Sequence, residues 1–215
     1  MNKRTLELFA LLLGVVATFG CVLRGNNVAQ SESVTKNAQA AQGLSLEIPD
    51  AAWEPVFFED LNDRTKRSGI SNLRQTVLAD DDLEVRFWFD HFEQIDGVII
   101  RRSGQEWSAI SIRDREQHQP SSLEQESLRV PKSGWEATWK KLTSAGILTL
   151  ADGSMTKCKP DVLDGIGYVI ETNFNRKYRT YRYGNPQRAD CDEAKRILLM
   201  ETILFEELDL ANHYK

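Results

Sequence analysis

Hydrophobic and polar residues alternate along the first half of the chain in a way that predicts three strands. In Leu83–Phe89 (LEVRFWF) apolar residues occupy every second position, which is the period of a half-buried strand. Gly97–Arg102 and Glu106–Arg113 are two further strand candidates, and the glycine-containing Ser103–Gln105 between them predicts a hairpin. We therefore expect an antiparallel meander here, with Leu73–Leu78 as a candidate edge strand.

A helical period follows in the second half. Residues from Trp135 to Leu142 that can pack against a core recur at i, i+3, i+4 and i+7, on one face of a helix. Ser133 and Glu136 have the spacing of a capping box, and Gly146 can adopt the left-handed conformation that ends a helix. The pattern predicts a helix between the capping serine and this glycine.

A second hairpin and a second helix complete the pattern. The hairpin is predicted over Gly167–Tyr183. The helix begins at Asp190, with Glu193 as the partner residue of its cap, and it is apolar over most of its circumference from Ile197 to Phe205. We expect it to pack centrally and to end near Asp209.

These elements predict an α+β fold: an antiparallel sheet of about five strands with two helices packed on it, in the order βββ–α–ββ–α. Residues 114–132 are polar and contain two prolines, so we interpret them as a long surface loop.

The stretch RKYRTYRY, residues 176–183, interleaves tyrosines with arginines. If Asn175–Arg176 is a two-residue turn, alternation assigns each strand residue to one face of the sheet. The residues expected to face the core are Tyr168, Ile170, Tyr181 and Tyr183. The opposite face carries an expected surface patch of Glu171, Tyr178, Thr180 and Arg182. In this patch we expect an ion pair between Arg182 and Glu171.

The same stretch could be a surface for nucleic acid, but two observations favour a sheet scaffold. It lacks the glycine-spaced aromatic pattern of RNA-binding strands. The chain also has a formal net charge of −5, whereas binding to phosphates requires a basic surface.

The N-terminus resembles an export signal. Lys3 and Arg4 precede the apolar run Leu8–Leu23, so residues 1–24 are a signal peptide or an uncleaved membrane anchor. Positive charge ahead of such a run favours export of the residues behind it. Residues 25–44 are polar, small and aperiodic and predict a disordered tether, followed by one domain over 45–215. The domain is therefore expected outside the cytoplasm, in the periplasm or tethered to the membrane by its N-terminal segment alone.

Processing of this signal has three alternatives. Cys21 follows Gly20, as at the lipid-attachment site of bacterial lipoproteins, although Thr18 and Phe19 depart from that pattern. Cleavage after Ala29, or near Ala38–Ala40, competes with lipidation.

Cys158 and Cys191 remain once Cys21 is assigned to the signal region. Two cysteines in an exported domain favour a disulfide over two free thiols, because the exterior is oxidising. The bridge would close a loop of about 34 residues and remove roughly 3.5–4 kcal/mol of unfolded-state entropy.

No motif in the chain indicates catalysis, a metal or a cofactor. His91 lies beside Asp90, Glu93 and Asp96, but no second segment supplies ligands at metal-binding spacing. The acidic run 79–84 lacks the alternating ligands and central glycine of a calcium-binding loop. We therefore predict no catalytic, metal or cofactor residues, while unmarked catalytic carboxylates stay an alternative.

Two longer segments resemble a known group of proteins. Lys132–Asp152 contains a GW…W helix, and Val162–Pro186 contains DG…YVIE and YRTYRYGNP, followed by an EAK helix at Glu193–Lys195. In these segments the chain is similar to a group of uncharacterised bacterial exported proteins. The resemblance implies a bacterial envelope setting and no particular activity.

Three functional hypotheses follow. The leading one is a non-enzymatic envelope module that binds another protein or a cell-surface component. The first alternative is a hydrolase acting on wall polymers or peptides, which predicts paired carboxylates in a pocket, or His91 against an acidic neighbour. The second is an inhibitor of an exported enzyme that inserts the loop 114–132.

Overall fold

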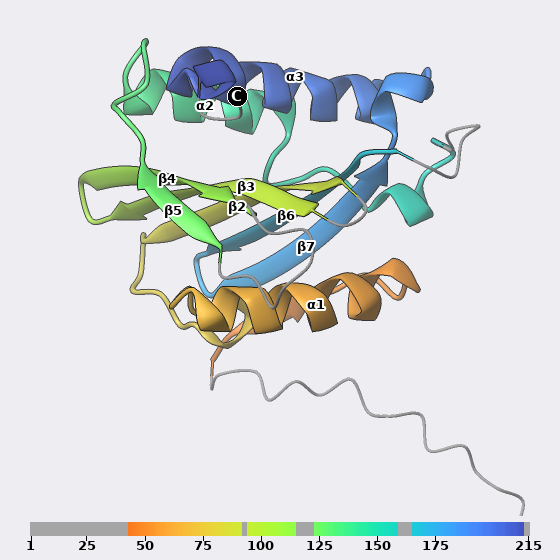
Figure 1. The fold of residues 1–215 in the computed structure, drawn as a ribbon, viewed down its shortest axis with the longest axis horizontal. Helices are drawn as coiled ribbons and strands as arrows, with labels where there is room; N and C mark the ends of the chain where they lie inside the picture. Colours follow the sequence, from red (N-terminus) through yellow and green to blue (C-terminus); the bar gives the residue numbers. More distant parts are fainter. Residues whose placement is uncertain (1–42, 92–93, 115–122, 159–164, 213–215) are drawn as a thin grey trace, which may run out of the picture. The chain divides into compact units, whose positions relative to one another are not determined.

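The computed structural model describes residues 43–91, 94–114, 123–158 and 165–212 (Figure 1). The predicted signal segment, the lipidation candidate Cys21 and residues 25–42 of the tether lie outside these residues. So do residues 115–122 of the predicted loop. Within the described ranges, no helix combines the length and apolar character needed to span a bilayer.

The centre of the domain is a seven-stranded sheet with the strand order β1-β7-β6-β2-β3-β4-β5. All neighbouring strands are antiparallel except β1 and β7, which pair in parallel. The strands are β1 (Ser45–Glu47), β2 (Leu83–His91), β3 (Gln94–Ser103), β4 (Glu106–Arg113), β5 (Glu124–Ser127), β6 (Gly167–Phe174) and β7 (Lys177–Gly184).

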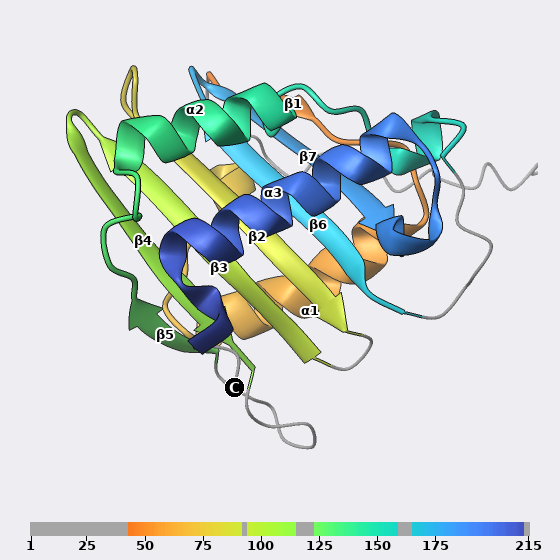
Figure 2. The same ribbon diagram turned by 90° about the horizontal axis from the view of Figure 1, so that it is seen from above.

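Helices cover both faces of the sheet. Helices α2 (Trp135–Ala145) and α3 (Asp192–Leu208) lie across one face, and α1 (Trp53–Arg67) lies across the other (Figures 1 and 2). Among the described residues, three short 3₁₀ turns lie between these elements, and a fourth follows α3: η1 (Leu73–Gln75), η2 (Gly153–Met155), η3 (Pro186–Arg188) and η4 (Leu210–Asn212).

The prediction of about five antiparallel strands with two helices is wrong in number and in direction, because the sheet is mixed and a third helix packs on it. β1 and β5 are only three and four residues long, too short to show a period in the sequence. β5 lies inside the predicted loop 114–132. The first three residues of the predicted edge strand Leu73–Leu78 form the turn η1, and the other three are not in a strand. The coarser assignment to the α+β class holds.

The predicted pairing of the second hairpin is confirmed. Tyr168 lies opposite Tyr183, and Ile170 lies opposite Tyr181. The turn residues Asn175 and Arg176 have φ values of 50° and 57°, the left-handed conformation that a tight two-residue hairpin turn requires. All four predicted core residues are buried on the α2–α3 side, within the largest apolar cluster.

The helix ends agree with the sequence at their C-termini and differ at their N-termini. Gly146 ends α2 with a φ of 101°, and Asp209 ends α3, both as predicted. The capping box of Ser133 and Glu136 does not form, because Gly134 occupies the cap with a φ of 82° that a side chain rarely adopts.

The cap of α3 also shifts by one residue. Cys191 is the N-cap, and its Sγ accepts a hydrogen bond from the Ala194 N–H at 3.3 Å. The predicted cap residue, Asp190, lies outside the helix and forms an ion pair with Lys195 at 2.7 Å.

Candidate functional site

The patch predicted at the surface of β6 and β7 lies beneath α1. Tyr178, Glu171 and Thr180 are 0%, 2% and 3% exposed, and only Arg182 keeps partial contact with solvent. The prediction assigned the correct residues to one face but assumed that this face was open. A helix that the sequence analysis did not identify covers it (Figure 1).

The buried patch belongs to a chain of hydrogen bonds that an ion pair extends from the sheet to α1. Glu171 accepts hydrogen bonds from the Trp88 indole N–H at 2.7 Å and from the Tyr178 hydroxyl at 3.0 Å. The Tyr178 hydroxyl in turn accepts from Arg74 Nε at 3.1 Å, and Arg74 Nη1 lies 2.5 Å from a Glu54 oxygen of α1. Burial, reinforced by the Glu171 charge, raises the pKa of Tyr178 well above its ordinary value. The phenol therefore stays protonated and donates to the carboxylate.

A second charged group lies on the same face. Glu84 accepts hydrogen bonds from Arg86 Nε and Arg101 Nε, both at 2.7 Å. Burial alone would raise the pKa of Glu84, but the two guanidinium groups outweigh it and lower the pKa. The two guanidinium groups compensate the charge of the buried carboxylate, so the arrangement is structural.

Arg182 pairs with Asp90 instead of Glu171. Arg182 Nη2 lies 3.1 Å from Asp90 Oδ2, and the guanidinium lies over the backbone of Gly167. A Cβ atom at Gly167 would lie 3.0–3.1 Å from the arginine nitrogens and from that aspartate oxygen. The absence of a side chain there leaves room for the ion pair.

Arg182 also lines a small cleft at the end of β7, with a volume of about 200 Å³. Among the described residues that line the cleft there is no carboxylate, so these residues do not supply the acidic pair that the hydrolase hypothesis requires. The lining residues are Trp53, Gly153, Ser154, Cys158, Arg182, Tyr183, Gly184, Pro186 and Ala189.

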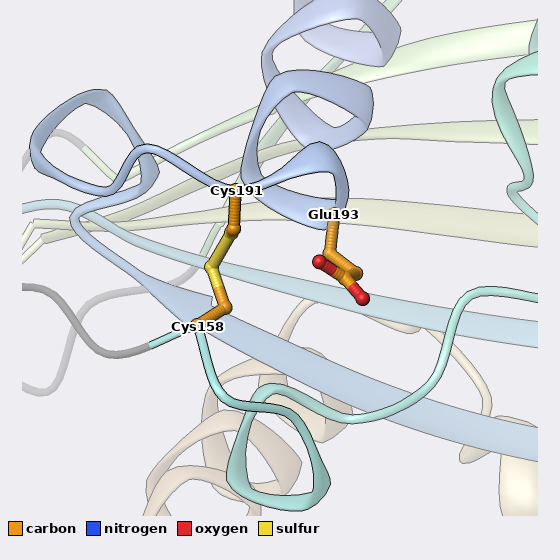
Figure 3. Close-up of side chains that lie close together, drawn as sticks. All are labelled: Cys158, Cys191 and Glu193. Atoms are coloured by element: carbon orange, nitrogen blue, oxygen red, sulfur yellow. A yellow bond between two sulfur atoms is a disulfide. The ribbon is translucent and has the colours of Figure 1, made fainter.

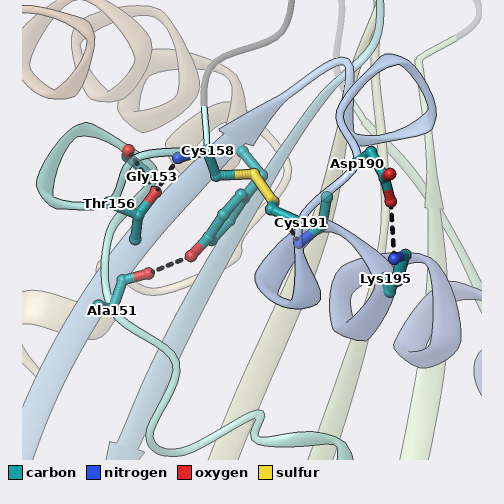
Figure 4. The surroundings of a disulfide bond; sticks show 9 residues. Ala151, Gly153, Thr156, Cys158, Asp190, Cys191 and Lys195 are labelled. Carbon is teal, nitrogen blue, oxygen red and sulfur yellow. Dashed lines mark hydrogen bonds and ion pairs between the residues drawn. A yellow bond between two sulfur atoms is a disulfide. The ribbon is translucent and has the colours of Figure 1, made fainter.

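The predicted bridge between Cys158 and Cys191 is present, with the two Cα atoms 5.7 Å apart. It joins the loop after η2 to the first residues of α3, beside the hydrogen bond from the Tyr183 hydroxyl to the Ala151 carbonyl oxygen (Figure 4). Glu193 lies next to the two sulfur atoms (Figure 3). In the part of the chain that the structure describes, this is the only group of three or more ligand-type side chains close enough to hold a metal ion. Both sulfur atoms are joined to each other, so we assign no metal site there.

The acidic residues near His91 are engaged with other partners. His91 is exposed at the end of β2, and Asp90 is paired with Arg182. Asp96 is buried and accepts a hydrogen bond from the Asp114 N–H at 3.1 Å, and burial raises its pKa. Glu93 lies outside the described residues.

The acidic run 79–84 also has structural roles. Asp80 lies just before β2 and forms an ion pair at 3.0 Å with Arg176, in the turn between β6 and β7. Asp82 accepts a hydrogen bond from the Gly104 N–H at 2.8 Å and so fixes the turn between β3 and β4. These carboxylates do not converge on one point.

Three half-buried tryptophans gather where the start of β4 meets the first two turns of α2, and we call them the tryptophan cluster (Trp107, Trp135 and Trp139). The Trp107 ring is parallel to the Trp135 ring, with an interplanar angle of 6° and centroids 5.8 Å apart. The Trp139 ring lies 5.8 Å from Trp107 at 49°. The cluster borders the apolar core without entering it.

Two polar side chains hold Trp107 in place. Its indole N–H donates to Glu136 Oε1 at 2.9 Å, and the Arg102 guanidinium lies 5.3 Å from its ring centroid. Arg102 is itself fixed by a 2.7 Å hydrogen bond to the Asp81 carbonyl oxygen. Glu136 therefore serves this contact instead of the predicted capping box.

The helical period places Trp135 and Trp139 on one face of a helix, but it does not connect them to Trp107. Trp107 and Trp135 are 28 residues apart in the sequence, so no local hydrophobic period can predict their contact. The only usable signal was the presence of tryptophans at the start of a strand and at the start of a helix.

Comparison of the chain with protein-family models and with curated protein sequences finds no match.

Proposed function

We propose that the protein is a non-enzymatic binding module of the bacterial envelope and that the tryptophan cluster is its binding surface. The observation that carries this proposal is the contact of the Trp107 indole with two further indoles, all three of which stay partly open to solvent. Single exposed apolar residues are common on protein surfaces, but contiguous apolar groups mark interaction sites. Tryptophan is also among the residues that contribute most to binding energy at interfaces.

The distribution of charge on the sheet supports binding over catalysis. The buried charges beneath α1 are paired with one another, as in Glu84 with Arg86 and Glu54 with Arg74. Charged groups that are buried and paired with one another cannot contact a substrate in solvent, whereas the tryptophan cluster is partly exposed.

The envelope setting is supported by the N-terminal segment and by the resemblance to exported proteins. The disulfide is compatible with an oxidising compartment. Export itself stays a prediction until it is measured.

Cosedimentation of the purified, processed protein with an envelope fraction of its host bacterium tests the proposal. We expect the wild-type protein to pellet with the envelope and Trp107→Ala to stay in the supernatant. Trp53→Ala is the matched control, because Trp53 is also half-buried but lies at the start of α1, on the other side of the sheet. Failure of the wild-type protein to pellet, or equal pelleting of Trp107→Ala, would overturn the proposal.

A further inference from the structure

We propose that the ligand of the tryptophan cluster is the pyranose ring of a neutral polysaccharide. This inference rests on the proposed function, because it names the class of envelope component that the cluster binds. It is carried by the size of the cluster, by its rigidity and by the charges at its border.

The exposed area of the cluster suits a sugar better than a protein. A tryptophan side chain has roughly 150–250 Å² of surface, so three half-buried indoles expose at most about 375 Å² together. A stable protein interface covers about 800 Å² on each partner. One or two sugar rings cover an area of the size that the cluster offers.

The rings are also held in place before any ligand arrives. Trp107 is fixed by the Glu136 hydrogen bond, by the Arg102 guanidinium and by the parallel ring of Trp135. The Trp135 ring and the Arg102 guanidinium already contact the Trp107 ring, so a sugar can stack only on the part of the cluster that these two groups leave open. A preformed surface loses little side-chain entropy on binding.

The chemistry of the cluster matches the two kinds of surface on a pyranose. The face of an indole carries partial negative charge, which attracts the weakly positive C–H groups on the flat side of the sugar. The hydroxyl groups at the edge of the sugar need acceptors and donors. Glu136 can accept from them, and the Arg102 guanidinium can donate to them.

The charges at the border point to a neutral ligand. Glu136 and Arg102 both contact Trp107 and have opposite signs, so they do not select an anion or a cation. Each also has a hydrogen-bond partner within the protein: Glu136 accepts from the Trp107 indole N–H, and Arg102 donates to the Asp81 carbonyl oxygen. Hydroxyl groups, which both donate and accept, fit such a border.

Titration of the mature protein, purified as its host produces it, with soluble oligosaccharides tests the inference. The probes are the β-1,4-linked tetramers of N-acetylglucosamine and of glucose. Isothermal titration calorimetry measures the dissociation constant of each tetramer. We expect at least one tetramer to bind and Trp107→Ala to weaken its binding about tenfold or more, while Trp53→Ala leaves it unchanged. Glu136→Ala is the second variant, because Glu136 is exposed and its loss should leave the fold intact. We expect it to weaken binding several-fold.

A second arm separates this inference from the proposed function. The envelope fraction is digested with a protease, and the cosedimentation is repeated. Retained pelleting of the wild-type protein, together with tetramer binding, supports a sugar ligand. If pelleting is lost after digestion, or if neither tetramer binds, the sugar assignment is overturned while envelope binding stands. If the wild-type protein does not pellet with undigested envelopes, the proposed function itself is overturned.

Discussion

The indole N–H of Trp88 donates a hydrogen bond to the Glu171 carboxylate at 2.7 Å, between neighbouring strands at the centre of the sheet. Trp88 is fully buried, and Glu171 is 2% exposed. The α1 side of the sheet is therefore held by polar contacts as well as apolar ones, whereas the α2–α3 side is a continuous apolar core.

Glu171→Ala should lower the free energy of unfolding by about 3 kcal/mol, because it leaves buried donors on Trp88 and Tyr178 without their acceptor. Urea unfolding measures the change. Glu106→Ala, at an exposed carboxylate on β4, is the control and should change stability by less than about 0.5 kcal/mol. Equal effects of the two substitutions would contradict the structural role of Glu171.

Gly97→Ala should destabilise the protein by roughly 1–3 kcal/mol, because the new methyl group has no space. Its Cβ would lie 2.6 Å from Trp88 Cε3 and 2.9 Å from the Phe87 carbonyl oxygen. Gly184→Ala is a matched control, since no atom lies within 4 Å of a Cβ built there. Thermal unfolding should separate the two variants, and similar melting temperatures would count against the close packing of Trp88.

Replacing both Cys158 and Cys191 by serine should lower the free energy of unfolding by about 3–4 kcal/mol, mainly because the unfolded chain is no longer constrained. Urea unfolding with and without reductant checks this. Reductant should destabilise the wild-type protein and leave the double variant unchanged. Rapid alkylation of both thiols in the native, exported protein would show that the bridge does not form.

Glu207 should make stability depend on pH in the acid range. The Lys141 ammonium and the Ser133 N–H bind this carboxylate and lower its pKa from 4.5 to about 2. Because the folded pKa lies below the ordinary value, the contribution is complete above pH 4.5 and is lost as the pH falls through about 2.

Glu207→Gln should therefore cost roughly 1–3 kcal/mol at pH 7, reduced by solvent screening at the half-exposed Lys141. The difference from wild type should shrink between pH 4.5 and pH 2 in urea unfolding experiments. A difference that does not change with pH would show that the carboxylate charge is not the cause.

Local patterns were sufficient for the elements that have a clear period or turn. Alternation along Leu83–Phe89 and the turn at Asn175–Arg176 gave the correct strands and the correct pairing of β6 with β7. The same alternation misled us about the opposite face. Glu171 was expected at the surface, whereas here it is buried beneath α1 and accepts hydrogen bonds from Trp88 and Tyr178.

The third helix had a usable signal that was not recognised. Trp53, Phe57 and Leu61 recur at intervals of four residues and lie on the sheet side of α1. The tryptophan cluster had no such signal, because its contact between β4 and α2 depends on the completed tertiary fold.

The chain enters the described domain through β1, whose three residues pair with β7 at the edge of the sheet. Leu44, just before this strand, is buried against Leu73 and Tyr178. Tension applied to the preceding residues would reach this short strand before any other element. The protein should therefore yield mechanically by peeling off β1, with the inner strands still intact, which would leave the backbone of β7 as an open edge of the sheet.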